Sequence, residues 1–425
     1  MLNPVKILIV GNGFGGVYAL KRLHKLFHKN KQVEFSMVGQ NNYFLFTPLL
    51  HEVATGGINP ENIIEPIRKV LGCCLKNFHL GKAEFVNLKN RTVKVADAEI
   101  PYDYLVLAPG AETNFYDVPG ASEHSLSLKS IDDAIKIKNR SIAQIELASN
   151  TEDREERKKI LRFVIVGGGP TGVELAAELQ ELIEESFSHY YKKNIIEDAS
   201  VILIQKDREL LPQFGEKVRK KSLEVLVKKG IKVMLQREVK EVSDTYVLLD
   251  NNETIPTKTV IWVAGIKPAN LNFDEPVERS NNQKLVVNKY LQIKGHREVF
   301  VIGDAAAVRV EDGDGYVPAL AQAAEKEARA VAKNIKLLVD GKEPKPFYYH
   351  HSGDLLSLGR WMAIGEIGGF TFSGGFTWWI WRTVYLSKLI SFRKKVRVAI
   401  DWTMDIFSPR DISDIGDASD IRDRS

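Results

Sequence analysis

The chain has 425 residues, which at about 150 residues per domain predicts two or three domains with ample core. Hydrophobic residues make up 44% and charged residues 27%, so neither a disordered chain nor a coiled coil is expected. The net charge of +4 is too small for a general nucleic-acid-binding protein. The two cysteines are the neighbours Cys73 and Cys74, which excludes a disulfide framework, a thiolate zinc site and C-x-x-C dithiol chemistry.

The chain opens on an apolar strand, VKILIV at residues 5–10, with no basic n-region or long apolar core before it. A G-x-G-x-x-G turn follows, formed by Gly11, Gly13 and Gly16, and then a helical pattern through about Phe27. No long apolar run is free of charge, so a membrane-spanning helix is not expected. We also expect no metal site, because the histidine pairs of the chain lack further ligands at metal-binding spacing.

The same order of strand, glycine turn and helix recurs at residues 162–166, where the turn residues are Gly167, Gly169 and Gly172 and a helix is expected from Val173. Such a turn lets the backbone approach a pyrophosphate at a helix N-terminus, where unpaired N–H groups point at the anion. One match could be a chance glycine-rich turn. Two matches, each between a strand and a helix, predict two dinucleotide sites on one chain.

Further strands are expected at residues 33–38 and 200–205, one after each glycine-turn helix. Residues 255–264 read as one buried strand that ends at Gly265. The last predicted strand, residues 299–302, ends at Gly303 and Asp304. A carboxylate at that position can accept hydrogen bonds from the ribityl hydroxyls of a flavin, although Gly-Asp alone is a common turn.

The C-terminal region combines aromatic and basic residues. Apolar residues recur at helical spacing and predict one apolar helix face, formed by Trp378, Trp381, Tyr385, Leu389, Phe392 and Val396. Basic residues surround it: Arg382, Lys388, Arg393, Lys394, Lys395 and Arg397. We expect this helix to lie in the plane of a membrane surface, while a core helix or a homodimer interface stay open as alternatives.

Several stretches together resemble type II NADH dehydrogenases, the single-subunit NADH:quinone oxidoreductases of respiratory membranes. The resemblance runs from residue 5 to about residue 405. Its stretches are the two glycine turns, residues 42–50 with 53–56, residues 102–110, Trp262 to Gly265, Gly303-Asp304, residues 318–322 and the tryptophan-rich basic tail.

The resemblance implies roles for individual residues. FAD would be bound by Gly11, Gly13, Gly16, Ala108, Gly110 and Asp304, with Thr47 and Pro48 near the flavin ring. The nicotinamide nucleotide would be bound by Gly167, Gly169, Gly172 and Gly265. Glu174 resembles the family's glutamate near nicotinamide and flavin, and Gln322 the first glutamine of its quinone-site motif. From the residues alone, Glu174 could be a carboxylate favoured by the helix dipole and Gln322 a surface amide in a helix over residues 318–334.

The chain departs from the family at three places. Gln40 stands where an acidic residue usually holds the adenosine ribose of FAD, and Gln205 stands where a glutamate accepts from the 2′-hydroxyl of NADH. We therefore expect that NADPH is tolerated, with Lys206 or Arg208 attracting its phosphate. Lys326 replaces the second glutamine of the quinone motif.

The expected fold is α/β, with two Rossmann-like dinucleotide-binding domains and a C-terminal amphipathic membrane-binding region. The expected boundaries are 1–155 and 276–335 for FAD, 156–275 for NAD(P)H, 336–410 for the membrane region and 411–425 for a disordered tail. The expected function is NADH:quinone oxidoreduction without proton pumping, on the cytoplasmic face of the inner membrane. A reductase of a small electron-carrier protein and a non-catalytic nucleotide sensor stay open, while a sulfide:quinone oxidoreductase would need separated cysteines.

Overall fold

The computed structural model describes residues 4–28, 32–71, 75, 77–310 and 315–414. The chain forms two compact units. The first comprises Met1–Leu45, Ile64–Glu112 and Ile266–His351, and the second comprises Phe46–Ile63, Thr113–Gly265 and Ser352–Ser425. Cys73 and Cys74, and residues 415–425 of the tail expected to be disordered, lie outside the described residues.

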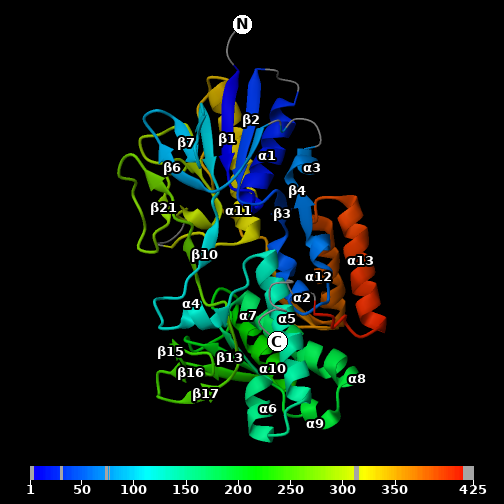
Figure 1. The fold of residues 1–425 in the computed structure, drawn as a ribbon. Helices are drawn as coiled ribbons and strands as arrows, with labels where there is room; N and C mark the ends of the chain where they lie inside the picture. The colour runs from blue at the N-terminus through cyan, green and yellow to red at the C-terminus, as the bar shows by residue number, and fades with distance from the viewer. Residues whose placement is uncertain (1–3, 29–31, 72–74, 76, 311–314, 415–425) are drawn as a thin grey trace. The chain divides into compact units, whose positions relative to one another are not determined.

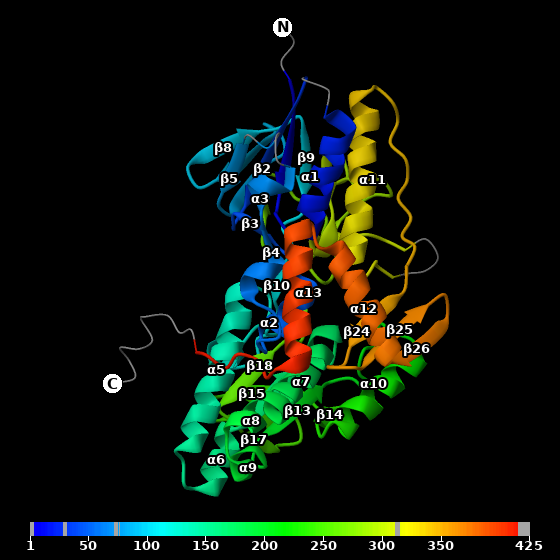
Figure 2. The same cartoon turned by 90° about the vertical axis from the view of Figure 1, so that its right-hand side faces the viewer.

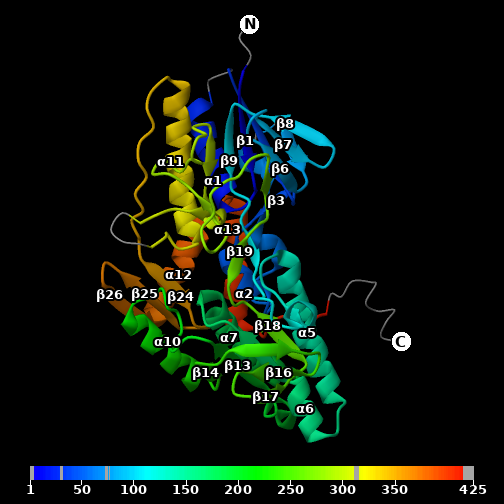
Figure 3. The ribbon, with the colours of Figure 1, turned by 90° about the vertical axis from the view of Figure 1, so that its left-hand side faces the viewer.

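The first unit is built on a five-stranded parallel sheet in the order β22-β9-β1-β2-β5. These strands are Val299–Val301, Tyr104–Leu107, Val5–Val10, Val33–Gly39 and Asn77–Leu80. Helices α1 (Phe14–Phe27) and α11 (Ala321–Val339) lie side by side, as Figures 1, 2 and 3 agree. Strand β1 and the first glycine-turn helix have the predicted bounds, because a strand buried in a parallel sheet must be apolar throughout.

Smaller elements complete this unit. An antiparallel group is formed by β6 (Ala83–Asn87), β7 (Thr92–Val95) and β8 (Ala98–Pro101), with β20 (Asn272–Phe273) at the edge beside β6. The remaining elements are β3 (Tyr43–Leu45), β4 (Ile64–Pro66), α3 (Ile67–Leu71), β21 (Leu285–Val286) and β23 (Ala306–Ala307). The short strands β10 (Ala111–Thr113) and β19 (Ile266–Pro268) lie where the chain passes from one unit to the other.

The second unit contains another five-stranded parallel sheet, in the order β11-β18-β12-β13-β14. Its strands are Ser125–Leu126, Thr259–Trp262, Arg162–Val166, Ser200–Gln205 and Lys232–Leu235. Its helices are α2 (Leu50–Val53), α4 (Ala121–His124), α5 (Ile131–Ser149), α6 (Arg154–Ile160), α7 (Pro170–Glu181), α8 (Ser188–Tyr190), α9 (Lys193–Ile196) and α10 (Glu216–Lys228). Two parallel sheets, each with a glycine turn and helix after a central strand, confirm the expected α/β class.

Two expectations for this unit need correction. Helix α7 begins at Pro170 rather than Val173, because proline suits the first helical position after Gly169. The strand expected over residues 255–264 is two strands, β17 (Thr254–Pro256) and β18. Strand β17 belongs to an antiparallel meander with β15 (Val239–Val242) and β16 (Tyr246–Leu249), and it ends at Pro256, which cannot donate to a sheet ladder.

The C-terminal part of the second unit is a three-stranded antiparallel sheet followed by two helices, which lie side by side in Figure 2. The strands are β24 (Asp354–Ser357), β25 (Ala363–Ile367) and β26 (Phe370–Gly374), and the helices are α12 (Gly375–Lys388) and α13 (Phe392–Phe407). The prediction of one continuous helix through this region is therefore wrong. The helix stops at Leu389, whose backbone is extended, and restarts with Ser391 as the N-cap of α13.

Candidate nucleotide cradles and a buried carboxylate row

The first glycine turn forms a hollow at the carboxyl end of β1. A Cβ on Gly11 would lie 1.9 Å from the Ala108 carbonyl oxygen, and one on Gly16 would lie 1.8 Å from the Gly11 carbonyl oxygen, so both positions need glycine for close packing. Gly13 differs, because a Cβ there would meet nothing within 4 Å. The hollow is lined by Gly11, Asn12, Gly13, Gly39, Gln40, Gly81, Lys82, Ala108, Pro109, Gly110 and Asn270, among others.

This hollow fits a dinucleotide. Helix α1 starts at Phe14, and its N-cap residue Gly13 has no side chain to cap it, so the first N–H groups of the helix are available to a phosphate. The open space at Gly13 is where a pyrophosphate must approach the backbone. Gln40 is exposed and lines the hollow. It occupies the position at which related proteins usually have an acidic residue. The strand and the helix on either side of this glycine turn were predicted correctly from the sequence.

Sequence reasoning found the turn at Gly303 and Asp304 in the first unit and missed the buried carboxyl group that contacts it, Glu327. Gly303 and Asp304 form a short turn after β22, and the Gly303 N–H donates to Glu327 Oε2 at 2.6 Å. Glu327 lies on α11, is almost fully buried, and burial raises its pKa to about 7. Gln322 is half-buried in the first turn of the same helix. Lys326 lies one turn further, with its ammonium 5.3 Å from the centre of the Tyr349 ring.

The second glycine turn repeats the design of the first. A Cβ on Gly172 would lie 1.9 Å from the Gly167 carbonyl oxygen, whereas one on Gly169 would meet nothing within 4 Å. Helix α7 likewise starts without a side-chain cap. Gly265 has a φ of +81°, and a Cβ there would lie 2.0 Å from the Tyr116 hydroxyl oxygen. Hence a second phosphate can be received at this helix N-terminus.

The end of β13 differs from the sequence-based interpretation. Gln205 is buried, accepts from the Gly168 N–H at 2.7 Å and donates to Asp207 Oδ2 at 2.8 Å. Lys206 is bound to Glu238 at 2.8 Å. A carboxylate is thus present at this strand end, on Asp207, and the Lys206 ammonium already has a partner. The first premise of the expected NADPH tolerance, the absence of an acidic group, is therefore wrong, whereas the attraction of the phosphate by Arg208, which is exposed, stays a prediction.

Thr47 and Pro48 lie in a short 3-10 turn of the second unit, directly before α2. Helix α2 carries two buried titratable residues, His51 and Glu52. The Glu52 carboxylate accepts a hydrogen bond from the Trp402 indole N–H of α13. Burial, and then the neighbouring Glu178, raise the pKa of Glu52 to about 8.

Helix α7 carries three buried carboxyl groups, Glu174, Glu178 and Glu181, which we call the carboxylate row. Their spacing of four and three residues puts them on one helix face. Glu174 accepts from the Ser357 N–H at 3.2 Å and lies 3.7 Å from His51 Nδ1. Burial raises the pKa of Glu174 well above its ordinary value, and burial lowers the pKa of His51 to about 4. Burial therefore favours the protonated, neutral form of Glu174, and His51 is a neutral imidazole at pH 7.

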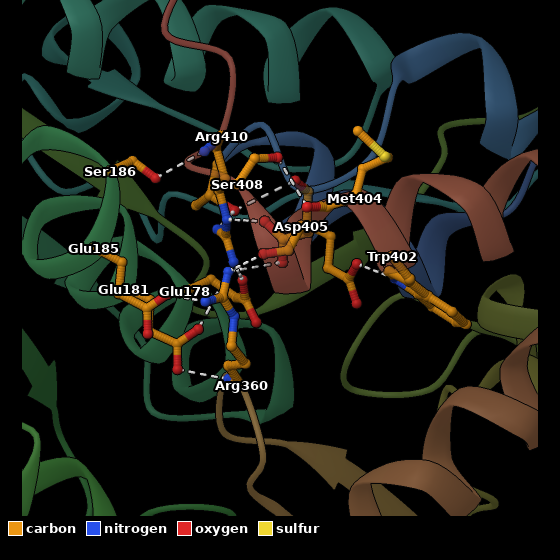
Figure 4. Close-up of polar contacts among 12 residues, drawn as sticks. Glu178, Glu181, Glu185, Ser186, Arg360, Trp402, Met404, Asp405, Ser408 and Arg410 are labelled. Atoms are coloured by element: carbon orange, nitrogen blue, oxygen red, sulfur yellow. Dashed lines mark hydrogen bonds and ion pairs between the residues drawn. The ribbon is translucent and has the colours of Figure 1, made fainter. Parts of the chain in front are cut away.

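Glu178 and Glu181, the other two members of the row, each have a cationic partner. Glu178 is paired with Arg410 at 2.6 Å, and Glu181 with Lys229 at 2.5 Å. Figure 4 shows Arg410 among these carboxylates, with Asp405 on its other side. Sequence reasoning found Glu174 and missed the others. The signal available was three glutamates at positions i, i+4 and i+7 of a helix that is otherwise mostly apolar.

The C-terminal helices expose a different surface from the one expected. Trp378 and Trp381 are 1% and 0% exposed, and Arg382 is buried over the Trp378 ring, so these residues belong to the core. The exposed stripe lies on α13, at Phe392, Val396, Ile400, Met404 and Phe407. Among the described residues, no helix is both long and apolar enough to span a bilayer.

The chain matches two family models. The model described as pyridine nucleotide-disulphide oxidoreductase matches residues 5–328, and the one described as NDH2 C-terminal domain matches residues 351–411. Type II NADH:quinone oxidoreductase Ndh of Mycobacterium tuberculosis is 32% identical, over 95% of this chain and 89% of that protein. A probable NADH dehydrogenase of Dictyostelium discoideum is 31% identical, over 97% and 92%.

Solved structures agree on the fold. NDH2 from Plasmodium falciparum, solved in complex with NADH, superimposes with a TM-score of 0.90 at 22% identity and covers 97% of this chain and 100% of that one. The sulfide:quinone oxidoreductase from Aquifex aeolicus gives 0.72 at 20% identity, with 95% of each chain covered. Of these two structures, the NDH2 structure has the higher TM-score, and the family model that matches residues 351–411 is also described as NDH2.

Proposed function

The chain belongs to the family of type II NADH:quinone oxidoreductases, and from this premise we propose that it passes two electrons from NADH through FAD to a membrane quinone. The reaction NADH + H⁺ + quinone → NAD⁺ + quinol runs by a ping-pong mechanism without proton pumping. The observation that carries the proposal is the pair of open glycine cradles, Gly13 and Gly169, each at an uncapped helix N-terminus after a parallel strand. The family resemblance inferred from the motifs is confirmed.

The two cradles serve two nucleotides. FAD is bound in the first unit by the backbone at Gly11, Gly13 and Gly16, with Gln40, Ala108, Gly110 and Asp304 around it. NADH is bound in the second unit at Gly167, Gly169 and Gly172, with Gln205 and Gly265. Bound FAD supplies the relay that accepts a hydride equivalent and releases two electrons. Thr47 and Pro48 serve the flavin ring in this proposal, as the motif resemblance implies.

Glu174 is the acid of the reaction in this proposal. Turnover consumes one proton beyond the hydride of NADH, and Glu174, whose pKa burial raises well above its ordinary value, can supply it. The Ser357 N–H holds one oxygen, and the neutral His51 ring lies beside the other, so the carboxylate left after proton transfer has partners. Gln322, in the first turn of α11, is assigned to the quinone by the motif that it resembles.

The membrane contact is assigned to α13. Its exposed apolar stripe is flanked by Arg393, Lys394, Lys395 and Arg397, a pattern typical of a helix lying in a bilayer interface. A quinone lives in the bilayer, so an enzyme that reduces it must reach the membrane surface. We assign the protein to the cytoplasmic face of the inner membrane as a peripheral protein.

The test is a two-step anaerobic titration of the purified, FAD-loaded protein. NADH should bleach the flavin absorbance, and a short-chain quinone should restore it rapidly. Bleaching without recovery would instead favour a reductase of an electron-carrier protein. A flavin that NADH does not bleach would reject the enzyme and favour a nucleotide sensor.

A further inference from the structure

Arg410 forms a hydrogen bond and an ion pair with the carboxylate row (Figure 4). It lies just beyond α13, and its side chain is 5% exposed. Nη2 donates to Glu178 at 2.6 Å, Nη1 to the Thr55 hydroxyl at 2.8 Å, and Nε to Asp405 at 3.1 Å. Its backbone N–H donates to the Ser186 hydroxyl at 3.0 Å. The C-terminal segment is thus tied to α7 and to the π-helical turn that follows α7.

The row cannot be fully ionised without cations, because each buried carboxylate loses its hydration. Glu178 and Glu181 have direct cationic partners, Arg410 and Lys229. The described contacts of Glu174 are Ser357 and His51, neither of them cationic at pH 7. The arrangement of cations therefore favours negative charge at Glu178 over negative charge at Glu174.

Charged and titratable groups from several elements face this row. They are His51 and Glu52 of α2, Lys229 at the end of α10, Arg360 after β24, Arg382 and Tyr385 of α12, Asp405 of α13, and Arg410. Only Arg410 contacts Glu178 directly among the cations described. Burial opposes ionisation of Glu178, and Arg410 is the foremost group that lowers its pKa below the ordinary value.

We infer that Arg410 is a positioning residue for the acid of the proposed reaction: it compensates the charge of Glu178, so that Glu174, one helical turn away, can release and regain its proton. This inference rests on the proposed function. When Glu174 gives its proton to the acceptor it becomes a carboxylate four residues from Glu178, and two such charges on one buried helix face repel. With Arg410 in place, its guanidinium, which also lies 3.1 Å from Asp405 and 3.7 Å from Glu181, offsets part of the Glu178 charge and weakens this repulsion.

The test uses four full-length, FAD-loaded proteins: wild type, Arg410→Met, Glu178→Gln and the double variant. Steady-state quinone reduction with NADH is measured at pH 6 and pH 8. In Arg410→Met, Glu178 should be protonated at pH 6 and increasingly ionised towards pH 8. We expect a loss of less than 3-fold at pH 6 and of more than 10-fold at pH 8. The double variant should stay within 3-fold of wild type at both pH values, because no uncompensated charge remains.

Two further measurements keep the outcome decisive. Arg410→Lys, which keeps a cation, should show a smaller pH dependence than Arg410→Met. The thermal unfolding midpoint of Arg410→Met should fall further below that of wild type at pH 8 than at pH 6, and Glu178→Gln should remove that difference.

Equal losses at both pH values, with no rescue by Glu178→Gln, would overturn the inference and leave Arg410 as a mere tether of the C-terminal segment. If the wild-type protein reduced no quinone, the proposed function would fail, while the pH dependence of unfolding would still test the pairing of Arg410 with Glu178.

Discussion

Asp207 supplies an acidic group at the end of β13, where nucleotide specificity is set. In dinucleotide-binding folds an acidic residue at the end of the second strand usually binds the ribose 2′-hydroxyl of NADH, and the sequence has Gln205 at that position. In the structure the Gln205 amide is held between the Gly168 N–H and the Asp207 carboxylate. The acidic group is therefore present two residues later, oriented by the glutamine, and sequence position alone could not identify it.

We predict that Asp207→Asn raises the ratio of kcat/KM for NADPH to that for NADH by at least about 10-fold, or ~1.4 kcal/mol. The reason is that a carboxylate at this strand end favours a ribose hydroxyl and repels a 2′-phosphate. Asp244→Asn, at an exposed turn of the same unit, is the matched control and should leave the ratio unchanged. An unchanged ratio in Asp207→Asn would remove this residue from nucleotide selection.

Two glycines of the second cradle, Gly169 and Gly172, allow the effects of substitution on nucleotide binding and on folding to be measured separately. We predict that Gly169→Ala raises the KM for NADH at least about 10-fold and leaves the unfolding midpoint within about 2 °C. The added Cβ enters open space in the fold, but it occupies the approach of the pyrophosphate. Gly172→Ala is the contrasting control, because its Cβ would lie 1.9 Å from the Gly167 carbonyl oxygen and should destabilise the protein itself. Unimpaired NADH binding in Gly169→Ala would place the nucleotide elsewhere.

At the scale of elements, apolar runs and glycine turns in the sequence predicted the strands and turns that depend on neighbouring residues. Strands β1, β12 and β13 have the expected bounds because apolar runs in parallel sheets are buried on both faces. The glycine turns were also predictable, since their function lies in the backbone. Partners distant in the sequence were not: Arg410 reaches Thr55 and Glu178 across 355 and 232 residues, and no local pattern marks that contact.

The tail shows where periodicity misleads. Its apolar spacing continued across residues 378–396, yet the chain bends between α12 and α13. Spacing identifies an apolar face without showing whether that face meets protein or lipid. Trp378 and Trp381 meet protein, whereas Phe392 and Phe407 are 80% and 82% exposed.

We predict that the double substitution Phe392→Ser and Phe407→Ser weakens binding to anionic lipid vesicles by at least about 10-fold, measured by co-sedimentation at physiological salt. Each phenylalanine would otherwise contribute up to about 2 kcal/mol on burial in the interface. The matched control is Leu147→Ser, which alters an exposed apolar residue of α5. Vesicle binding equal to that of the control would reject α13 as the contact.

At the scale of the whole molecule, buried carboxyl groups make stability fall with rising pH. Burial raises the pKa of Glu327 to about 7, that of Glu181 to about 7 and that of Glu52 to about 8. Unfolding returns each to its ordinary value of 4.5. At these three groups the folded state binds more protons than the unfolded state between about pH 4.5 and pH 8, and the stability that they contribute below that window is lost across it.

Glu327 offers a clean measurement of this effect, because glutamine keeps an acceptor for the Gly303 N–H and removes the titration. A folded pKa of about 7 against 4.5 corresponds to roughly 3 kcal/mol lost by pH 8. We predict that the unfolding midpoint of the FAD-loaded wild type falls between pH 5 and pH 8, and that Glu327→Gln makes this fall smaller by roughly 5 °C. Asp244→Asn, an exposed carboxyl for comparison, should change the fall by less than about 1 °C. If Glu327→Gln and wild type lost the same stability between pH 5 and pH 8, Glu327 would have to be ionised over that whole range. The Gly303 N–H would then donate to a charged carboxylate and not to a neutral carboxyl group.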